Sequence, residues 1–412
     1  MYASMPTFLE DRIATFSVEK VQKAWGGRNI FHGATPAADA LHLSSNDYLN
    51  LLNEPVLIEA RAKEFLHAER ELLMSAVFLR GESPISRLED KLARFTKFEG
   101  AIICQSGWTA NVGLIQAIAN SKVPVYLDLN AHMSLWQGAV SAGAKAIAFM
   151  HNNVSHAERQ IRKHGVGILV VDSVYSTNGS LCPLTDFANL SKDTGCVFVV
   201  DESHSLGTHG PHGAGLVAEL GLTSKVHFLT ASLAKAFAGR AGFIACPSIF
   251  KDYFAMESYP AIFSSAVLNH EVAWFDKLTD FVVQADLRRE RLHSVTRTIR
   301  NALSELGYDL SSGTEQIIAL ESGTECQTMI LRDALESYGV FGSMFLAPAT
   351  PKNRTLVRFS VNSGITDNDV DRLISVCSKI RHEIKLDSWP RRKARGVVKP
   401  PTSSSSAVPR DC

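Results

Sequence analysis

Three short polar segments follow apolar runs, and their residue types suit the binding of a charged ring and a phosphate group. Lys235 comes after the apolar run 226–229, Asp201 closes the run 197–200, and Ser106-Gly107-Trp108 follows the run 101–104. In an open α/β sheet, ligands bind outside the carboxyl ends of the strands. We therefore expect these three polar strand ends to face one cavity.

Lys235 is an unusual lysine because it is surrounded by apolar residues, with Leu233 and Ala234 before it and Ala236 and Phe237 after it. A lysine in such a segment either extends its amine to water or is used chemically. Desolvation lowers the lysine pKa from its ordinary value of about 10.4 and makes the amine a better nucleophile. Taken alone, Lys235 is more typical of a structural or surface residue.

Asp201 ends a strand of sequence Cys-Val-Phe-Val-Val, so we expect its carboxylate to be buried. A buried carboxylate is costly unless a cation pairs with it, and a protonated pyridinium nitrogen is such a cation. The alternative is an aspartate that caps the next helix. His204 either contacts the hydroxyl of the same ring or satisfies a loop carbonyl.

The spacing of these groups favours the cofactor hypothesis. Asp201 precedes Lys235 by 34 residues, which is room for one helix and one strand, so their strand ends are expected to be neighbours. A helix predicted over 111–120 would present backbone N–H groups at Ser106-Gly107-Trp108 to a phosphate, and Ser232 adds a hydroxyl. Together these residues predict a pyridoxal 5'-phosphate site with the cofactor held as a Schiff base on Lys235.

The elements that must position these groups alternate between short apolar runs and helix-length amphipathic stretches. Strands without in–out alternation, separated by helices, indicate a mostly parallel α/β sheet covered on both faces. We predict an N-terminal segment 1–55, a large cofactor-binding domain 56–275, a smaller C-terminal α/β domain 276–386 and a disordered tail 387–412. A single long amphipathic helix is predicted over 270–305.

Bulk composition excludes several function classes. The 412 residues carry 42 basic and 42 acidic side chains, which argues against nucleic acid or a membrane surface as the main partner. We predict no transmembrane segment and no signal peptide. Seven scattered cysteines without a CxxC pair are typical of reduced thiols, and we expect a cytoplasmic enzyme.

Two motifs carry a resemblance to a known family. Asp-Glu-Ser-His-Ser-Leu-Gly-Thr-His-Gly at 201–210 and Ala-Ser-Leu-Ala-Lys-Ala-Phe at 231–237 resemble those of the α-oxoamine synthases. These pyridoxal-phosphate enzymes condense an amino acid with an acyl-CoA and release CO₂. The resemblance implies the fold-type I, aspartate aminotransferase-like architecture, with a large, mostly parallel seven-stranded sheet. It extends from about residue 45 to Arg358.

The resemblance also implies residue roles. Lys235 matches the Schiff-base lysine, Asp201 the pyridinium partner, His204 the contact to the ring hydroxyl and His132 the histidine that stacks on the ring. Further cofactor contacts are implied for Ser106, Gly107, Trp108, Ser173 and Ser232 and, from a second subunit, for Ser264 or Ser265.

Arg358 matches the arginine that grips the substrate carboxylate, with Asn46 assisting it. An arginine in an apolar strand needs an anion, and a carboxylate fits its planar fork. From the residues alone, a structural ion pair explains Arg358 equally well. Because the matched phosphate serine comes from a neighbour, the resemblance implies an obligate homodimer with shared active sites.

One branch of the family matches better than the others. The stretch 74–82 carries one glycine where enzymes acting on glycine, alanine or serine are glycine-rich, which argues against those standard substrates. The segments 106–111, 131–136, 149–153 and 258–265 resemble the quorum-sensing autoinducer synthases that make long-chain α-aminoketones. This implies a medium-chain acyl-CoA, around decanoyl, and S-adenosylmethionine or 2-aminobutyrate as the amino donor.

Other functions remain as alternatives. The nearest are a biosynthetic sibling, such as 8-amino-7-oxononanoate synthase or 2-amino-3-ketobutyrate CoA ligase, and a non-catalytic subunit of a heterodimeric synthase. The presence of Lys235 argues against the second. A dinucleotide-dependent dehydrogenase is disfavoured because no GxGxxG follows the early strands. No metal site is predicted, since His151-Asn152-Asn153 has no partner at ligand spacing.

Overall fold

The computed structural model describes residues 4–67, 73–79 and 81–389. Their central element is a sheet of seven strands in the order β2-β8-β7-β6-β5-β3-β4. Every pair from β7 to β4 is parallel, and only β8 runs antiparallel to its neighbours. The prediction of a mostly parallel, seven-stranded fold-type I sheet is therefore confirmed.

The strands of this sheet are short and almost entirely buried, as apolar runs without alternation predict. They are β2 (Gly100–Cys104), β3 (Val125–Asp128), β4 (Ala146–Phe149), β5 (Ile168–Asp172), β6 (Val197–Asp201), β7 (Phe228–Ser232) and β8 (Gly242–Cys246). Six of them correspond to continuous apolar runs, and three of these, β2, β6 and β7, correspond to the runs 101–104, 197–200 and 226–229 that were expected to carry the site residues. The seventh, β4, lies at the sheet edge and alternates in exposure, so it lacks the continuous apolar run that identifies the others.

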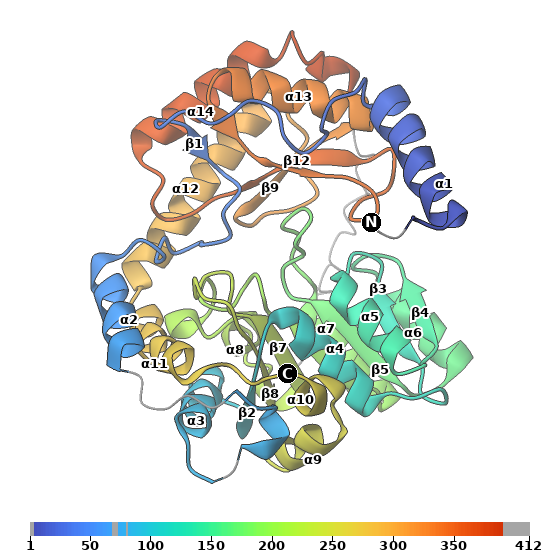
Figure 1. Cartoon of the computed structure of the whole chain (residues 1–412), viewed down its shortest axis with the longest axis vertical. Coiled ribbons are helices and arrows are strands. Elements are labelled where there is room, and N and C mark those ends of the chain that lie inside the picture. Colours follow the sequence, from blue (N-terminus) through green and yellow to red (C-terminus); the bar gives the residue numbers. More distant parts are fainter. Residues whose placement is uncertain (1–3, 68–72, 80, 390–412) are drawn as a thin grey trace, which may run out of the picture.

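Helices pack on both faces of the sheet (Figure 1) and supply the crossover connections that parallel strands require. They are α3 (Pro84–Thr96), α4 (Gly107–Ile118), α5 (Met133–Ser141), α6 (Val154–His164), α7 (Leu184–Thr194), α8 (Leu216–Glu219), α9 (Phe250–Glu257) and α10 (Tyr259–Phe263). Single turns of 3₁₀ helix occur at η2 (Ala76–Phe78), η3 (Pro211–Gly213) and η4 (Thr223–Lys225).

A second, smaller sheet lies beyond the carboxyl ends of the parallel strands (Figure 1). It is antiparallel, in the order β11-β12-β9, with bounds Ser343–Phe345, Thr355–Ser360 and Ile317–Gly323. The helices α12 (Asp286–Glu305), α13 (Glu325–Ser337) and α14 (Asp367–Ile380) accompany it. The domain boundaries predicted from the sequence remain a proposal.

The N-terminal segment joins the smaller part of the molecule. Its short strand β1 (Leu41–His42) pairs in parallel with β10 (Val340–Phe341). Before it come α1 (Thr7–Thr15) and the π-helical η1 (Phe16–Ala24), and after it comes α2 (Pro55–His67). This pairing brings Asn46 toward the smaller sheet, although 312 residues separate it from Arg358.

Two expectations about helices and the tail were wrong. The single helix predicted over 270–305 is two helices, α11 (Asn269–Val283) and α12, because Ala285 leaves helical geometry with ψ of 30°. The break lets α11 pack on α2 and α3 while α12 packs on α14. The predicted tail begins too early, since Leu386–Ser388 form a 3₁₀ turn, η5, and Trp389 is buried. Residues 390–412 lie outside the described part.

Two further properties follow from the described residues. No helix among them is long and apolar enough to cross a membrane. The six cysteines in the described ranges are all unpaired, and five of them are buried.

Candidate active site

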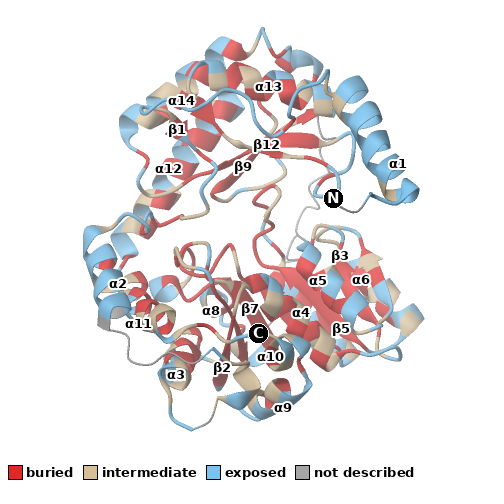
Figure 2. Ribbon diagram, viewed as in Figure 1, coloured by how far each residue is buried: buried red, intermediate tan, exposed pale blue. Residues whose placement is uncertain are grey.

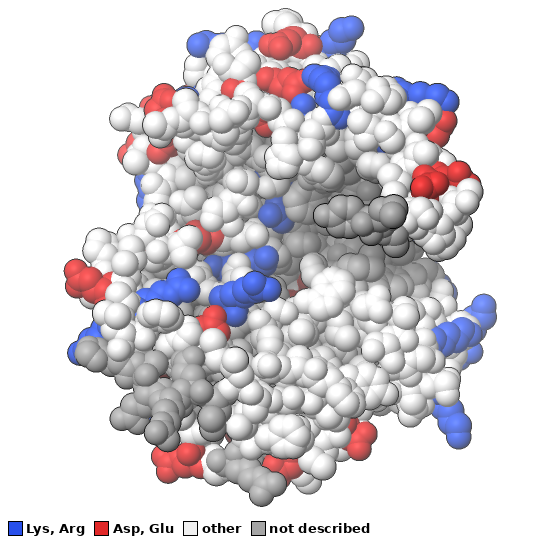
Figure 3. Space-filling view, viewed as in Figure 1, with Lys and Arg blue, Asp and Glu red and all other residues white. Residues whose placement is uncertain are grey.

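A cavity of about 1230 Å³ lies between the carboxyl ends of the parallel strands and the smaller sheet. Figure 3 shows the molecule hollowed between its two parts, with basic side chains inside the hollow. Most of the predicted site residues line this cavity, namely Asn46, Gly107, Trp108, His132, Asp201, His204, Ser232, Lys235 and Arg358. Residues from six separate stretches of the chain therefore meet at one place.

The register of three neighbouring strands sets the floor of the cavity. Asp172, Asp201 and Thr230 are paired across β5, β6 and β7, so their side chains lie side by side at one edge of the sheet. Strand β7 continues two residues further, to Ser232, and Lys235 follows in the turn. The expectation that the strand ends of Asp201 and Lys235 are neighbours is confirmed.

Asp201 is buried and its two carboxylate oxygens have separate partners. Oδ2 accepts a hydrogen bond from Asn111 Nδ2 at 2.6 Å, and Oδ1 accepts one from the backbone N–H of Ser203 at 2.8 Å. The amide of Asn111 is itself oriented, because its Oδ1 accepts a hydrogen bond from the Thr230 hydroxyl at 2.6 Å. These contacts hold a negative charge in place at the cavity floor.

Lys235 is half-buried and extends into the cavity without a carboxylate of its own among the described residues. Burial, and then the positive charge of Arg358, lower the pKa of the Lys235 amine, while the charge of Asp201 opposes them. A lysine with a lowered pKa gives up its proton more readily, and this suits a nucleophile or a base.

His132 and Trp108 form one wall of the cavity. Their rings meet edge to face with centroids 6.1 Å apart. Nδ1 of His132 accepts from the backbone N–H of Ser134 at 3.3 Å and also contacts the Ser134 hydroxyl at 2.8 Å. Burial lowers the pKa of His132, against the charge of Asp201, so the ring is neutral at neutral pH.

The N-terminus of α4 opens into the same cavity. Ser106 is its N-cap and accepts from the backbone N–H of Thr109 at 3.1 Å, while the N–H groups of Gly107 and Trp108 begin the helix. First-turn N–H groups have no partner within the helix and favour a negative charge. A Cβ at Gly107 would lie 2.5 Å from Cβ of Ser232, so only glycine allows this close approach to the end of β7.

His204 is buried in the loop after β6, where it contacts the N-terminal segment. Its Nδ1 is 2.7 Å from the hydroxyl of Tyr48, and its carbonyl accepts from Gln316 Nε2 at 2.7 Å. Burial, followed by the charge of Lys235, lowers the pKa of His204 well below its ordinary value. The ring is therefore neutral and serves as a hydrogen-bonding group.

Arg358 is buried in β12 and no acidic side chain of the described residues pairs with it. Its Nη1 donates to the carbonyl of Ser176 at 2.8 Å and its Nη2 donates to Oδ1 of Asn46 at 3.0 Å. The guanidinium lies 4.5 Å above the Phe345 ring, and its Nε is buried without a partner. A buried cation with an unused donor at a cavity wall is a site for an anion.

Comparison with known proteins places this geometry in a family. A family model described as aminotransferase class I and II matches residues 38–376. The chain belongs to this family.

Relatives within the aminotransferase class I and II family narrow the assignment. A CAI-1 autoinducer synthase of Vibrio campbellii is 40% identical over 383 residues, which cover 93% of this chain and 97% of that protein. An 8-amino-7-oxononanoate synthase of Symbiobacterium thermophilum is 29% identical and covers 90% and 94%, respectively. The resemblance to the α-oxoamine synthases and their autoinducer-synthase branch is confirmed, and the chain is a pyridoxal-phosphate enzyme of the acyltransferase type.

A solved structure of serine palmitoyltransferase with pyridoxal phosphate superimposes with a TM-score of 0.84. The superposition covers 92% of this chain and 99% of the serine palmitoyltransferase chain, and the two sequences are 22% identical. At this identity the likeness shows the shared fold.

The residues of the cavity fit pyridoxal phosphate, the cofactor of this family. The N-terminus of α4 and the Ser232 hydroxyl would hold the phosphate, in a cradle that a side chain at Gly107 would fill. Asp201 would face the ring nitrogen, and His132 would lie against the ring. Lys235 lies in the same cavity as the amine that would bind the aldehyde.

Four predicted cofactor contacts lie outside the cavity wall. Ser106 caps α4 through its own helix. The Ser173 hydroxyl is fully buried and donates to the Asp201 carbonyl at 3.1 Å, so it supports the strand end rather than reaching the cavity. Ser264 donates to the Pro260 carbonyl, and Ser265 accepts from Gln105 through its carbonyl.

The sequence interpretation missed two residues that hold site groups in place. Asn111 orients Asp201, and its signal is a polar residue on the apolar face of a helix that starts at the predicted phosphate loop. Tyr48 contacts His204 from 156 residues away. Nothing local indicates that contact, because it depends on how the N-terminal segment folds over the sheet.

Glu202, next to Asp201, makes stability depend on pH. Burial raises its pKa from 4.5 to about 8, although Val217 N–H donates to Oε1 at 2.7 Å. Because the native pKa is the higher one, the native state binds more protons, and stability falls as the pH rises from about 4.5 to about 8. Glu202→Gln keeps the acceptor and carries no charge. We expect it to raise the unfolding free energy at pH 8.5 by about 2–4 kcal/mol and to change little at pH 5.

Urea denaturation at the two pH values measures this difference. Glu219→Gln, an exposed glutamate in α8, serves as the control and should leave the pH profile as in the wild type. Parallel profiles for the wild type and Glu202→Gln would contradict the assignment.

Proposed function

We propose that the chain condenses an amino donor with a medium-chain acyl-CoA, with loss of CO₂, to form an α-aminoketone precursor of a quorum-sensing signal. The donor would be S-adenosylmethionine or 2-aminobutyrate and the acyl group about decanoyl. The 40% identity with a CAI-1 autoinducer synthase over nearly the whole chain supports this branch. The cytoplasmic location expected from the sequence stays a prediction.

The observation that carries the proposal is the presence of a buried arginine and a half-buried lysine in one cavity. Arg358 has no acidic partner among the described residues, and Lys235 lines the same cavity. A substrate without a carboxylate would leave the charge of Arg358 uncompensated. A substrate with a carboxylate satisfies Arg358 through a two-pronged contact and brings its α-carbon toward Lys235.

Bound pyridoxal phosphate supplies an electron sink for the negative charge that develops at the substrate α-carbon. Asp201 keeps a negative charge at the cavity floor, held by Asn111 and Ser203, where a protonated ring nitrogen requires it. Lys235 Nζ removes the α-proton and returns a proton later, and its lowered pKa suits this role. Arg358 and Asn46 hold the carboxylate until it leaves as CO₂.

The acyl-CoA requires space beyond the cofactor, and the wall of the cavity provides it. The lining continues past Lys235 to Leu129, Met133, Trp136 and Met150, which are apolar and suit an acyl chain. Their presence supports a substrate with a hydrocarbon tail, such as a medium-chain acyl group.

A homodimer with shared sites is part of the proposal. Ser264 and Ser265 lie outside the cavity of their own chain, as expected of residues that serve a neighbour. Phe263, beside them, exposes 78% of its surface, and Phe78 on η2, which contacts α10, exposes 63%. Such exposed aromatic residues are typical of an interface. A measurement of the molecular mass in solution tests whether the protein is a dimer.

Arg358→Gln tests the assignment of the carboxylate site. We expect KM for the amino donor to rise by about 30- to 1000-fold, because a two-pronged contact between buried charges is lost. KM for the acyl-CoA should change little. Product formation is followed by mass spectrometry with S-adenosylmethionine, 2-aminobutyrate, alanine, glycine and serine against acyl-CoAs of several lengths.

Arg162→Gln, at an exposed i,i+4 pair with Glu158, is the matched control and should retain wild-type constants. An unchanged donor KM in Arg358→Gln would contradict the carboxylate site. A wild-type preference for alanine with a dicarboxylic acyl-CoA would instead favour an 8-amino-7-oxononanoate synthase, the activity that related proteins carry by name.

A further inference from the structure

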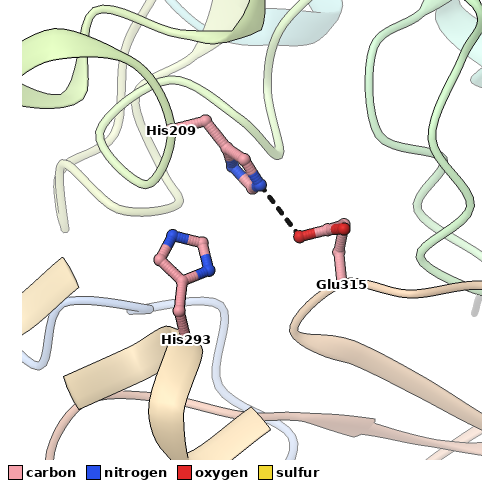
Figure 4. A group of neighbouring side chains, drawn as sticks. All are labelled: His209, His293 and Glu315. Carbon is pink, nitrogen blue, oxygen red and sulfur yellow. Dashed lines mark hydrogen bonds and ion pairs between the residues drawn. The ribbon is translucent and has the colours of Figure 1, made fainter. Parts of the chain in front are cut away.

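A group of metal-ligating side chains lies away from the active site, at the junction of the two sheets. It consists of His209 in the loop after β6, His293 on α12 and Glu315 just before β9. Each offers one ligand atom, and these atoms lie within 4.8 Å of one another. Figure 4 shows the three side chains pointing toward a common point from three different elements.

The protonation of His293 follows from its partner. Its Nε2 is 2.8 Å from the backbone carbonyl of Thr208, which only accepts hydrogen bonds, so Nε2 carries a proton. In a neutral ring with its proton on Nε2, Nδ1 has no proton. Its Nδ1 therefore presents a lone pair. An N–H donated to a backbone carbonyl is the usual outer-shell contact of a metal-binding histidine.

The orientation of His209 follows from the Thr208 hydroxyl. This hydroxyl has one proton and lies 3.0 Å from the Ser205 carbonyl and 3.2 Å from the His204 carbonyl, so it can donate to one of them. It then accepts from Nδ1 of His209 at 2.9 Å. With Nδ1 protonated, Nε2 of a neutral ring directs a lone pair at a carboxylate oxygen of Glu315, 2.9 Å away.

In that tautomer, the lone pair of His209 Nε2 and the Glu315 oxygen repel one another unless a cation lies between them. That cation is either an extra proton on His209 or a metal ion. We propose that His209 Nε2, His293 Nδ1 and a Glu315 oxygen form a site for a divalent transition ion of the Zn²⁺ class. Two imidazoles and one carboxylate are a ligand set that zinc prefers, whereas Ca²⁺ and Mg²⁺ prefer oxygen ligands.

The surroundings suit a cation with a solvent ligand. The cluster lines a cavity of about 590 Å³, whose wall also includes Glu219 and Glu290. The wall also contains two arginines, Arg289 and Arg297, and the charge of Arg289 is paired with Asp286 at 2.5 Å. The cavity supplies an entry path and a water for the fourth position, and its lining shares no residue with that of the active-site cavity.

Binding at this site would connect the smaller sheet to the loop that carries catalytic groups. Loop 202–210 leaves Asp201 and includes His204, and Gln316, next to Glu315, donates to the His204 carbonyl. An ion at the cluster would link that loop to α12 and β9 and so stabilise the arrangement of the active site without touching the substrate. No spacing in the sequence indicated this, because the ligands are 84 and 22 residues apart.

Titration of the holoenzyme with ZnCl₂ after chelator treatment tests the proposal. We expect the wild type to bind one Zn²⁺ per chain and MgCl₂ or CaCl₂ to give no binding. His293→Gln places an amide N–H where Nε2 donates to Thr208, but it lacks the Nδ1 ligand. His209→Gln likewise lacks the Nε2 ligand. Since loss of an outer-shell partner alone costs about 10–100-fold in affinity, either variant should weaken Zn²⁺ binding at least about 100-fold.

His212→Gln is the matched control, because this histidine lies three residues after His209 in η3, is 65% exposed in its side chain and pairs with Asp286. It should bind Zn²⁺ as the wild type does. Glu315→Gln provides a third variant should a histidine variant fold poorly, and thermal unfolding in chelator checks each fold. The absorption spectrum of bound Co²⁺ should indicate nitrogen and oxygen ligands and lack a thiolate band. Such a spectrum would exclude the exposed Cys326 as a ligand.

Equal Zn²⁺ affinity in the wild type and in His209→Gln, His293→Gln and Glu315→Gln would overturn the proposal, and so would a wild type that binds no Zn²⁺. In either case the cation at His209 is a proton, and the cluster is an ion pair between His209 and Glu315.

Discussion

Replacement of Lys235 by alanine is expected to lower turnover by about 10³–10⁴-fold. The amine lies in the cavity with a lowered pKa and within the field of Asp201. Without it, the protein lacks the amine that we propose removes the α-proton of a substrate whose carboxylate is held by Arg358. Release of CoA, followed with a thiol reagent, measures the rate.

Two further variants separate this role from a structural one. Lys235→Arg keeps the positive charge, but a guanidinium does not lose its proton, so it should be as inactive as Lys235→Ala. A small primary amine added to Lys235→Ala should restore part of the rate. Lys225→Ala, an exposed lysine in the turn before β7, is the control and should keep full activity. Retention of more than a tenth of the activity by either Lys235 variant would end this assignment.

Replacement of Asp201 by asparagine should lower turnover by about 10²–10³-fold, which is the usual cost of losing a preorganised electrostatic contact in an active site. Asparagine is neutral, so it no longer favours a protonated ring nitrogen. It also conflicts with its neighbours, because Asn111 Nδ2 and the Ser203 N–H both donate to Asp201. An asparagine amide has one acceptor oxygen in place of the two carboxylate oxygens, so one of these two donors is left without its partner.

Asp172→Asn is the control for this second experiment. Asp172 is the register neighbour of Asp201 on β5, and burial, followed by the charge of Asp201, raises its pKa well above the ordinary value. Its carboxyl therefore favours the neutral form more than an ordinary aspartate does, and an amide of the same shape should keep activity within about tenfold of the wild type. Equal rates for Asp201→Asn and Asp172→Asn would refute the role of Asp201. The visible absorbance of the cofactor shows whether each variant retains it.

The core of the active site could be predicted because its signals are local. Asp201, Ser232 and the α4 N-terminus each stand at the end of a short apolar run, and the carboxyl ends of parallel strands meet at one edge of a sheet. The edge strand β4 and the break between α11 and α12 were harder, because an alternating edge strand and a continuous amphipathic pattern do not reveal where the chain turns.

Ser173 illustrates the limit of a match by position. Its residue type and place at the end of β5 agree with a cofactor contact, yet its hydroxyl is directed at the Asp201 carbonyl and at Ser205, 2.6 Å away. Side-chain direction at a strand end depends on the packing of the next loop, which the residue type does not encode.

By itself, the sequence determined the fold class, the family and the residues that end the strands, because these depend on local hydrophobic pattern and on short motifs. The tertiary structure alone decided which distant groups meet. Arg358 reaches Asn46 across 312 residues, Tyr48 reaches His204 across 156, and His209 joins His293 and Glu315 at the junction of two sheets. Such contacts depend on strand order and on how the smaller sheet lies over the larger one, and neither property is written in the spacing of nearby residues.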